Sequence, residues 1–327
     1  MEYTHLGRTG LQVSRLCLGT MNFGPTTSEK DAFAIMDKAL EAGITFFDTA
    51  NVYGGLDHRG RTEEILGRWF ALGNGRRESV VLATKVYHTT DDPHDGPNAV
   101  ASLSAYKIRR HLAASLTRLQ TDHIELYQMH HVDTRVTWDE LWGTFQPIVD
   151  SGVVDYIGSS NFGARHICYA QAAAEKRHFL GLVSEQHKYS LTCRPPELEV
   201  LPTCEDMGLS VLAWSPLGGG LLSGRVLDPE EGSRGAKAGE KLTPGEREQV
   251  QAYSEFCRDL GAPESVVALA WIMAQKDFII PIIGPRTMDQ LVSALDSIEL
   301  TLDAQSLERL DEIFPGPGGQ APEAYAW

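Results

Sequence analysis

The sequence lacks any long apolar run, and no segment approaches the roughly 20 residues that cross a bilayer as a helix. Its N-terminus has no apolar stretch followed by a cleavage site, so it is unlike a signal peptide. Cysteine is scarce: the five cysteines are scattered, and none forms a CxxC pair. Scattered cysteines are typical of a reducing compartment, and their spacing offers no zinc site. We therefore expect a cytoplasmic protein with no membrane partner and no bound metal.

A basic stripe is also missing. The 327 residues carry a net charge of −15, and basic pairs such as Arg76-Arg77 and Arg109-Arg110 stand alone. Proteins that hold a nucleic-acid backbone usually concentrate lysine and arginine on one surface. We therefore expect no nucleic-acid partner.

What is present is a regular alternation of short runs rich in Val, Ile and Leu with longer amphipathic segments. The expected strands cover residues 16–20, 45–49, 80–85, 124–130, 154–159, 181–186, 210–214 and 278–283. The expected helices cover residues 28–43, 104–120, 137–152, 164–176, 195–208, 263–276 and 287–297. Eight such units predict a parallel sheet, which is either an open doubly wound sheet or a closed barrel.

The segment after the first strand separates these two folds. An open dinucleotide-binding sheet carries GxGxxG there, whereas this chain has LGTMNFG. Eight regular units in about 300 residues instead fit an α/β fold of the (β/α)8 TIM barrel type. Residues 3–16 are expected to form a β-hairpin that turns at Arg8-Thr9-Gly10 and plugs the N-terminal mouth of the barrel. Because no linker of disordered composition interrupts the chain, residues 1–327 are predicted to form one domain.

Two connections are too long to be plain turns: residues 86–103 after the third strand, and the Gly-rich residues 217–243 after the seventh. Both are expected at the C-terminal face, where (β/α)8 barrels place their active sites. Long connections at such a face are usually functional, and a tolerated surface insertion is the alternative.

Polar side chains collect where the expected strands end. Asp48 ends the second strand and Tyr53 follows five residues later, while Lys85 ends the third strand and His130 the fourth. A nearby ammonium lowers the pKa of a phenol, and a carboxylate holds that ammonium in place. A neutral imidazole can hydrogen-bond to a substrate oxygen. Together the four suit a general acid that protonates an oxygen while hydride arrives at carbon, although packing or solvation explains each one alone.

The neighbouring histidines in ELYQMHHVD do not belong to one site by default, because adjacent residues on a strand point to opposite faces. One face would carry Ile124, Leu126, Gln128 and His130, and the other would carry Tyr127, Met129 and His131. Alternation alone does not say which face looks into the barrel. A metal site is disfavoured because no third ligand of suitable spacing accompanies the pair.

The chain resembles the aldo-keto reductase superfamily from the N-terminal hairpin to about residue 315. The motifs that carry the resemblance follow in the family's order: GITFFDTANVYG, VVLATK, IELYQMHHVD, IGSSNF, SEQHKYSL, LAWSPLGGGLLSG and PIIGPRTMDQL. The resemblance implies a (β/α)8 barrel that binds NAD(P)H and reduces a carbonyl group. It implies Tyr53 as the proton donor, Lys85 and Asp48 as the groups that tune it, and His130 as the residue that orients the carbonyl.

The resemblance also implies where the cofactor binds. Ser160, Asn161 and Gln186 would hold the nicotinamide carboxamide, and Trp214 would stack on the nicotinamide ring. The other implied cofactor contacts are Thr20, Met21, Asp48, Ser215, Pro216, Leu217, Gly219, Arg225, Gly284, Arg286 and Gln290.

Arg286 is the best candidate to contact a 2′-phosphate, because a planar guanidinium suits that group. We therefore expect NADP(H) to be preferred over NAD(H). One departure from the family pattern concerns the adenine. Many members carry Glu-Asn a few residues after the glutamine, whereas this chain has Gln290 followed by Ser293-Ala294.

The expected substrate is a small aldehyde or ketone, which is reduced to an alcohol. The chain looks most like a bacterial branch similar to reductases that act on a 2,3-enoyl intermediate of NDP-deoxysugars, and this is one alternative. The acidic loop residues Asp91, Asp92 and Asp95 favour a small carbonyl over an anionic NDP-sugar.

A second alternative is a regulatory role like that of the potassium-channel β-subunits, which share the fold and the cofactor site. Catalysis is favoured over it because all four catalytic positions are filled. Similar barrels exist as monomers and as larger assemblies, so a homo-oligomer stays open. The Pro/Gly-rich tail, residues 314–327, ends with Tyr325 and Trp327 and is expected either to line the substrate pocket or to fray.

Overall fold

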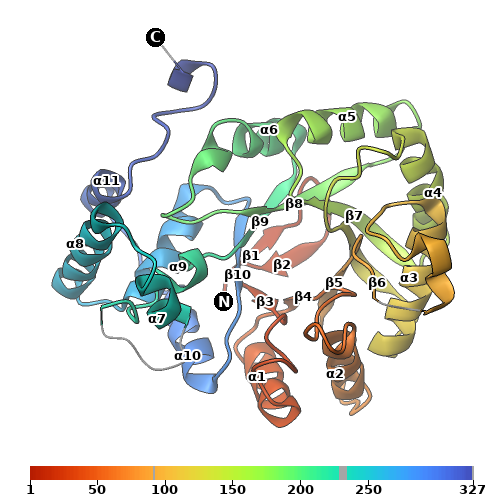
Figure 1. The fold of residues 1–327 in the computed structure, drawn as a ribbon, viewed down its shortest axis with the longest axis horizontal. Helices are drawn as coiled ribbons and strands as arrows, with labels where there is room; N and C mark the ends of the chain where they lie inside the picture. Colours follow the sequence, from red (N-terminus) through yellow and green to blue (C-terminus); the bar gives the residue numbers. More distant parts are fainter. Residues whose placement is uncertain (91–92, 228–233, 326–327) are drawn as a thin grey trace.

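The computed structural model describes residues 1–90, 93–227 and 234–325. Eight parallel strands form a closed barrel in the order β10-β3-β4-β5-β6-β7-β8-β9 (Figure 1). Their bounds are β3 (Cys17–Gly19), β4 (Phe46–Asp48), β5 (Val81–Val86), β6 (Ile124–Met129), β7 (Val154–Ser160), β8 (Leu182–Lys188), β9 (Ser210–Trp214) and β10 (Ile279–Ile283). Each strand overlaps its expected range, and the predicted (β/α)8 barrel is confirmed.

The N-terminal hairpin consists of β1 (Tyr3–His5) and β2 (Gln12–Ser14), which pair antiparallel. Leu6 and Val13 are fully buried and pack with the side chains that fill the barrel interior. Gly7 permits this approach, because its φ is 59° and a Cβ there would lie 2.4 Å from a backbone carbonyl oxygen of β8. The hairpin therefore closes the N-terminal end of the barrel, as expected.

Helices follow the strands and cover the outside of the barrel (Figure 1). Their bounds are α1 (Glu29–Glu41), α2 (Arg61–Phe70), α3 (Ala105–Leu119), α4 (Trp138–Asp150), α5 (Ala164–Glu175), α6 (Val200–Met207), α7 (Arg234–Gly239), α8 (Pro244–Leu260), α9 (Glu264–Gln275), α10 (Met288–Asp296) and α11 (Ala304–Ile313). Helix α1 is capped by Ser28, the first residue of the expected range, whose hydroxyl oxygen accepts a hydrogen bond from the Asp31 backbone N–H at 3.2 Å.

Three of the longer helices, α2, α8 and α11, lie outside the ranges expected from the sequence. Helix α2 begins after Gly60, whose φ is 93°. Glycine has no side chain that could cap the helix, so the sequence gives no start signal there. Helix α8 does carry such a signal, a capping box between Thr243 and Glu246 with Pro244 at the first position. Helix α11 begins at Asp303, whose side chain accepts from the Ser306 N–H. The expected helices were based on apolar periodicity, so the caps at Thr243 and Asp303 did not enter the prediction.

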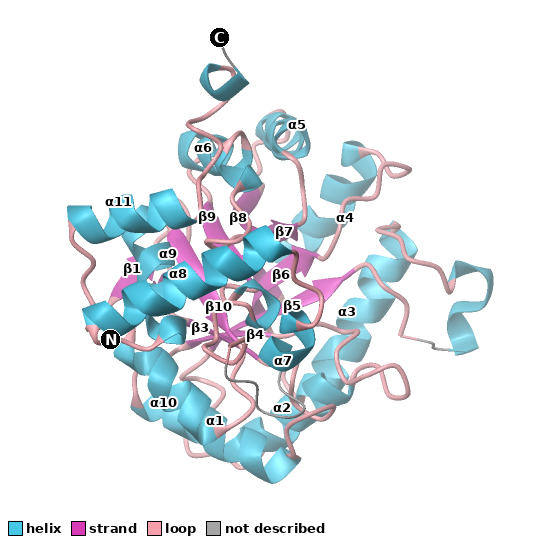
Figure 2. Cartoon of the chain, turned by 60° about the vertical axis from the view of Figure 1, so that its left-hand side comes forward, coloured by secondary structure: helices cyan, strands magenta, loops and turns pink. Residues whose placement is uncertain are grey.

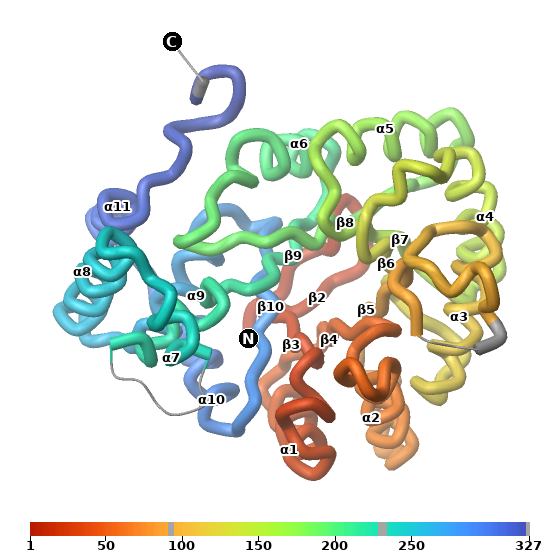
Figure 3. Tube along the Cα trace, in the orientation of Figure 1, coloured from red at the N-terminus to blue at the C-terminus, as the bar shows by residue number. Residues whose placement is uncertain are grey.

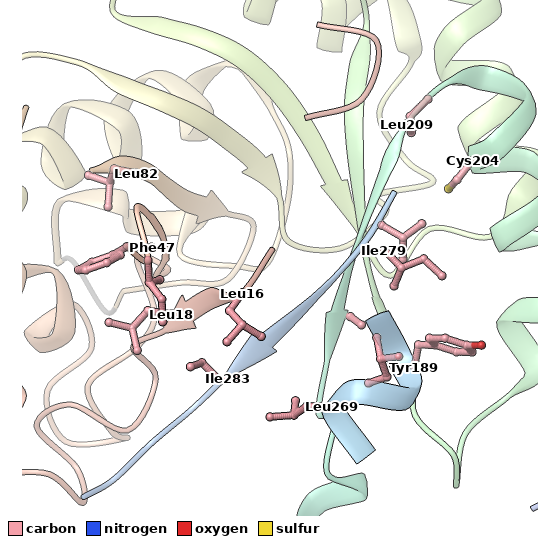
Figure 4. Packing of buried hydrophobic residues seen from close by; sticks show 14 of the residues in the cluster. Leu16, Leu18, Phe47, Leu82, Tyr189, Cys204, Leu209, Leu269, Ile279 and Ile283 are labelled. Atoms are coloured by element: carbon pink, nitrogen blue, oxygen red, sulfur yellow. The ribbon is translucent and has the colours of Figure 1, made fainter. Parts of the chain in front are cut away.

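Side chains on the strands alternate between the barrel interior and the layer under the helices. The interior cluster is formed by Leu6, Val13, Cys17, Phe46, Ala83, Leu126, Val183, Leu212, Ile280 and Ile282. Phe47, the neighbour of Phe46, belongs instead to the larger outer cluster, part of which Figure 4 shows together with Leu16, Leu18 and Ile279. On β6, Leu126 faces inward and Tyr127 outward. The interior face of β6 is therefore the one that carries Gln128.

The described residues of the long connection 217–243 form a short helix and a 3-10 turn. Helix α7 packs on a 3-10 turn at Gly218–Gly220, and a Cβ on Gly220 would lie 2.8 Å from the backbone nitrogen of Gly235. Glycine at position 220 thus lets the two parts of the connection touch backbone to backbone.

The chain after α11 leads away from the barrel in Figure 2. Figure 3 shows the same course for the end of the tube, and Ala321 N donates to the Leu198 carbonyl oxygen at 2.9 Å. The described part of the tail therefore contacts the connection between β8 and α6. Trp327 and the side chain of Tyr325 lie outside what the structure describes. Within the described ranges, every helix is too short or too polar to span a bilayer.

Candidate active site

Three of the four candidate catalytic residues meet at the C-terminal end of β4 and β5. Lys85 Nζ donates to Asp48 Oδ2 at 2.6 Å, to the Thr49 carbonyl oxygen at 2.8 Å, and to Tyr53 Oη at 3.3 Å. Lys85 is 0% exposed and Asp48 is 2% exposed. Parallel pairing of β4 with β5 brings Asp48 beside this lysine, and the short turn after β4 returns Tyr53 to it. The geometry is that of a phenol held against a buried ion pair.

The second carboxylate oxygen of Asp48 is held by two amides. Its Oδ1 accepts from Gln128 Nε2 at 2.9 Å and from Gln186 Nε2 at 2.8 Å. Gln128 was not among the expected site residues, although strand alternation had put it on the face of His130. Gln186 was expected to hold a carboxamide, and in this structure its amide nitrogen turns to Asp48. Thr20 holds the backbone of Asp48, because its hydroxyl donates to the Asp48 carbonyl oxygen at 2.9 Å.

Burial and neighbouring charges shift the pKa values of Lys85 and Tyr53 in opposite directions. Burial lowers the pKa of Lys85, but the carboxylate of Asp48 and the phenol of Tyr53 outweigh it, so the pKa stands above its ordinary value. Burial raises the pKa of Tyr53, and the Lys85 ammonium offsets only part of that rise. The ammonium acts in the expected direction, but the desolvation of the phenolate is the larger effect.

His130 lies beside this cluster, with its ring centroid 5.9 Å from that of Tyr53 and the ring planes at 85°. Burial, followed by the positive charge of Lys85, holds the pKa of His130 well below its ordinary value, so the imidazole is neutral. Its Nδ1 is buried and lacks a hydrogen-bond partner among the described residues. His88 packs edge-on against it, with centroids 4.9 Å apart.

His131 is separated from this group. Its side chain is exposed, Nδ1 lies 3.0 Å from the Val132 carbonyl oxygen, and its ring tilts against Tyr87 with centroids 5.4 Å apart. Only one of the two neighbouring histidines therefore reaches Tyr53, as the alternation argument requires.

The residues expected around the nicotinamide form a connected set at the ends of β7 and β9. Asn161 has a φ of 60°, which is unusual for a residue other than glycine. Its Nδ2 donates to Ser160 Oγ at 2.9 Å and to the His130 carbonyl oxygen at 3.1 Å, and its Oδ1 accepts from Trp214 Nε1 at 3.2 Å. Lys188 Nζ lies 5.9 Å from the centroid of the Trp214 ring.

The connection after β9 begins with a glycine-rich turn, in which the Gly218 and Gly220 N–H groups donate to the Ser215 and Leu217 carbonyl oxygens at 2.9 Å each. Ser215 has a φ of 55°, and the consecutive Gly218, Gly219 and Gly220 have φ values of 57°, 70° and 112°. Pro216 is buried, Leu217 is half-buried, and no atom lies within 4 Å of where a Cβ of Gly219 would be. Arg225 lies in the same connection and has interaction partners in the protein.

Near the start of α10, Arg286 and Arg234 lie close enough for their charges to repel one another. Arg286 is half-buried, and the repulsion between it and Arg234 contributes, after burial, to lowering the pKa of Arg234. Arg234, which was not among the expected residues, donates from Nη2 to Asn22 Oδ1 at 3.0 Å, and Asn22 Nδ2 donates to the Gly284 carbonyl oxygen at 2.7 Å. Met21, beside Asn22, is 46% exposed.

The positions that depart from the family pattern have local partners. Gln290 Oε1 accepts from the Arg286 backbone N–H at 2.8 Å. Ser293 Oγ lies 3.3 Å from Ser265 Oγ, and Ala294 is buried. The pair that stands where similar proteins carry Glu-Asn is thus turned to neighbouring protein groups.

Asp95, one of the three acidic residues of the 86–103 connection, does not face solvent. Its side chain is 3% exposed and accepts from Arg110 Nε at 3.0 Å, and His111 Nε2 lies 3.0 Å from its other oxygen. Asp91 and Asp92 lie outside the described residues. Across the part of the chain that the structure describes, no group of three or more His, Cys, Asp or Glu side chains could hold a metal ion.

Comparison with known proteins gives a family and close relatives. The Aldo/keto reductase family model matches residues 15–314. An uncharacterized oxidoreductase, YrpG of Bacillus subtilis (strain 168), is 60% identical over 327 residues, which covers 100% of both chains. Protein tas of Escherichia coli (strain K12) is 31% identical, with 97% of this chain and 100% of that protein covered. A probable voltage-gated potassium channel subunit beta of Oryza sativa subsp. japonica is 30% identical, with 96% of each chain covered.

Proposed function

Because the chain belongs to the aldo/keto reductase family, and is therefore an NAD(P)H-dependent oxidoreductase, we propose that it uses NADPH to reduce an aldehyde or a ketone to an alcohol. The observation that supports this most is the contact of Tyr53 Oη with Lys85 Nζ at 3.3 Å, with Asp48 Oδ2 2.6 Å from the same nitrogen. A phenol held against a buried ammonium is suited to give a proton to an oxygen that gains negative charge.

Each of the four residues has a distinct task in this reaction. When bound, the cofactor supplies the hydride that goes to the carbonyl carbon. His130 is neutral, and its N–H donates to the carbonyl oxygen and polarises it. Tyr53 transfers its phenolic proton to that oxygen, and the ammonium of Lys85 stabilises the phenolate that remains. A phenol is protonated at neutral pH, so Tyr53 carries the proton that the oxygen receives.

The residues present fit a dinucleotide phosphate. Gly219 lies beside open space, where a pyrophosphate can approach the backbone closely. Ser160, Asn161 and Gln186 would hold the carboxamide, Trp214 would stack on the ring, and Arg225 would reach a phosphate. Arg286 would contact the 2′-phosphate, because a planar guanidinium suits that group.

Replacing Tyr53 by phenylalanine tests the proton donor. We expect Tyr53→Phe to lower the rate of NADPH-dependent carbonyl reduction by about 10²- to 10⁴-fold, the usual contribution of a positioned acid. The ring remains, so NADPH affinity, measured by quenching of tryptophan fluorescence, should stay within about twofold of the wild type. Tyr106→Phe, at an exposed tyrosine of α3, is the matched control and should change neither. Wild-type turnover in Tyr53→Phe would remove the proposed mechanism.

Replacing Arg286 by alanine tests the cofactor choice. A charge-assisted hydrogen bond is worth about 1.5–3 kcal/mol, so Arg286→Ala should weaken NADPH binding by about 10- to 100-fold. NADH lacks the 2′-phosphate, so its affinity should change little. Arg309→Ala, at an exposed residue paired with Glu312, is the control. An equal loss for NADPH and NADH would show that Arg286 does not contact that phosphate.

A regulatory role is the second candidate, and the rice relative named as a potassium channel β-subunit favours keeping it. The filled positions 48, 53, 85 and 130 favour catalysis. The assay that separates the two is NADPH consumption with a panel of aldehydes and ketones. Tight NADPH binding without turnover of any carbonyl would support the regulatory role.

An NDP-deoxysugar 2,3-enoyl reductase is the third candidate. The acidic-loop evidence against an anionic sugar nucleotide is weaker than the sequence indicated, since Asp95 faces Arg110 and His111. NDP-linked enoyl sugars therefore belong in the substrate panel. Faster turnover of these than of any small carbonyl would favour this candidate over the proposed one.

A further inference from the structure

Two loops at the C-terminal face meet around the candidate active site. The Tyr53 loop, residues 49–60, follows β4 and carries the candidate proton donor. The β5–α3 loop, residues 87–104, begins with Tyr87 and His88, and the His88 ring packs on His130 with centroids 4.9 Å apart. The first residues of the β5–α3 loop therefore form part of the wall beside the reacting groups.

A buried chain of three side chains joins these loops. Asn51 of the Tyr53 loop contacts His111 of α3, with Nδ2 and Nδ1 2.8 Å apart. The other ring nitrogen of His111, Nε2, lies 3.0 Å from Asp95 Oδ2 in the β5–α3 loop. Asn51 is 0% exposed, and His111 and Asp95 are each 3% exposed. Water is thus kept from the contacts that tie one loop to the other.

The hydrogen bonds of this chain have a definite direction. Because Asn51 Nδ2 donates to Nδ1, the neutral imidazole of His111 carries its proton on Nε2 and donates it to the Asp95 carboxylate. Asp95 also accepts from Arg110 Nε at 3.0 Å, which keeps its charge compensated. Losing the imidazole would leave a buried amide nitrogen and a buried carboxylate oxygen without their partners.

A second contact joins the same two loops. Arg59, near the end of the Tyr53 loop, donates from Nη1 to the Thr89 carbonyl oxygen at 3.0 Å. The Tyr53 loop is closed on itself, because the Gly60 N–H donates to the Tyr53 carbonyl oxygen at 2.9 Å. The residues that contact the β5–α3 loop and its helix, Asn51 and Arg59, thus lie on either side of Tyr53 in a loop whose ends are tied to the Tyr53 backbone.

The β5–α3 loop is held differently at its far end. Leu103 N donates to Asp133 Oδ2 at 3.1 Å, and Arg135 Nη2 donates to the Ala101 carbonyl oxygen at 2.7 Å. Lys107 Nζ also donates to the carbonyl oxygen of Val100. These contacts fix the return of the loop to α3, whereas the Asn51–His111–Asp95 chain and the Arg59–Thr89 contact join its earlier part to the Tyr53 loop.

We propose that His111 is a positioning residue of the substrate site, which through Asn51 and Asp95 holds the β5–α3 loop and the Tyr53 loop as one unit. It does not touch the reacting atoms. It sets the distance between the wall that carries His88 and the proton donor Tyr53. The part of the proposal that concerns carbonyl turnover rests on the proposed function, whereas the linkage of the loops does not.

Hydrogen–deuterium exchange of the full-length protein tests the linkage without any assay of activity. Asp95→Asn keeps the shape of the side chain but weakens the bond to His111, and the change lies in the β5–α3 loop. The amides of the Tyr53 loop, including Tyr53 and Gly60, should then exchange at least about 10-fold faster, because a buried charge-assisted bond is worth more than 1.4 kcal/mol. An increase confined to the β5–α3 loop would overturn the linkage.

Kinetics of His111 variants test the effect on the substrate site. His111→Phe keeps a ring of similar size but neither hydrogen bond, and kcat/KM for the carbonyl should fall about 10- to 100-fold while the Kd for NADPH stays within twofold. His111→Gln, whose amide replaces the Nε2 donor to Asp95, should recover part of the loss. An unchanged kcat/KM in folded His111→Phe, or an equal loss in NADPH affinity, would overturn the proposal.

A control separates this effect from general destabilisation. Tyr253→Phe removes a buried hydrogen bond between α8 and α9, in which Oη donates to the Glu264 carbonyl oxygen at 2.5 Å. Its Tm should fall while kcat/KM and the exchange of both loops stay unchanged at temperatures well below Tm. If His111→Phe does not fold, Asp95→Asn supplies the same kinetic test. Wild-type protein without carbonyl turnover would defeat the proposed function and leave the exchange test decisive for the linkage.

Discussion

The buried pair of Lys85 with Asp48 yields a prediction whose magnitude follows from the structure. Asp48→Asn removes the negative charge 2.6 Å from an ammonium that is 0% exposed. Removing one partner of a buried ion pair typically costs about 3–5 kcal/mol, because the other charge stays desolvated and uncompensated. The side-chain amide that the substitution introduces has a second destabilising effect. If its oxygen faces Lys85, its NH2 group points at the donors of Gln128 and Gln186, which hold Oδ1 at 2.9 and 2.8 Å.

The free energy of unfolding of Asp48→Asn should therefore fall by about 3–5 kcal/mol at pH 7, measured by urea denaturation followed through tryptophan fluorescence. Glu205→Gln is the matched control, because the Glu205–Lys276 pair has a similar separation of 3.0 Å but side chains about half exposed. Its loss should stay below about 1 kcal/mol. The double variant Asp48→Asn/Lys85→Met should be more stable than Asp48→Asn alone, since no buried charge is left. A loss in Asp48→Asn as small as in the control would refute this reasoning.

The two neighbouring histidines and the pH response give the remaining predictions. His130→Ala should lower kcat/KM by about 10²-fold or more, because the polarising donor is lost, while His131→Ala, at an exposed ring, should change it less than about threefold. Steady-state kinetics check both, and equal losses would contradict the assignment. Burial lowers the pKa of His88, His111 and His130, so below the unfolded value near 6.5 the unfolded chain takes up protons first. The free energy of unfolding should therefore fall between pH 7 and pH 5.5, by at most about 1.4 kcal/mol per pH unit for each histidine, and urea denaturation at both values checks this. Constant or rising stability over that range would count against lowered pKa values for these three histidines.

The barrel and the strand-end residues could be predicted because each depends on local pattern. Strand alternation and the rule that active sites lie at C-terminal strand ends suffice to place Asp48, Lys85 and His130 at one mouth. Neighbouring parallel strands end at the same edge of the barrel, so residues that end them meet without further information. Tyr53 was included because the family resemblance named it, and the structure brings its hydroxyl to Lys85.

The residues that hold the site together were harder to predict, because their partners lie far away in the chain. Gln128 is an uncharged residue on β6, and its role became visible only once Asp48 on β4 lay 2.9 Å from its amide. Arg234 lies in a connection without periodicity, and nothing local indicates that it meets Asn22 from the first strand's loop. Asp95 was taken for a solvent-facing acid because composition does not record orientation.

The pKa of Tyr53 shows why the direction of one interaction does not give the direction of the whole pKa shift. The sequence indicated that Lys85 lowers this pKa, and that contribution is present. Burial contributes more with the opposite sign, and burial is a property of the whole mouth of the barrel. In the proposed reaction Tyr53 gives its proton while charge develops on the substrate oxygen. The rate then depends on how closely His130, Lys85 and Tyr53 are held around that oxygen, and this makes the loops that position them part of the chemistry.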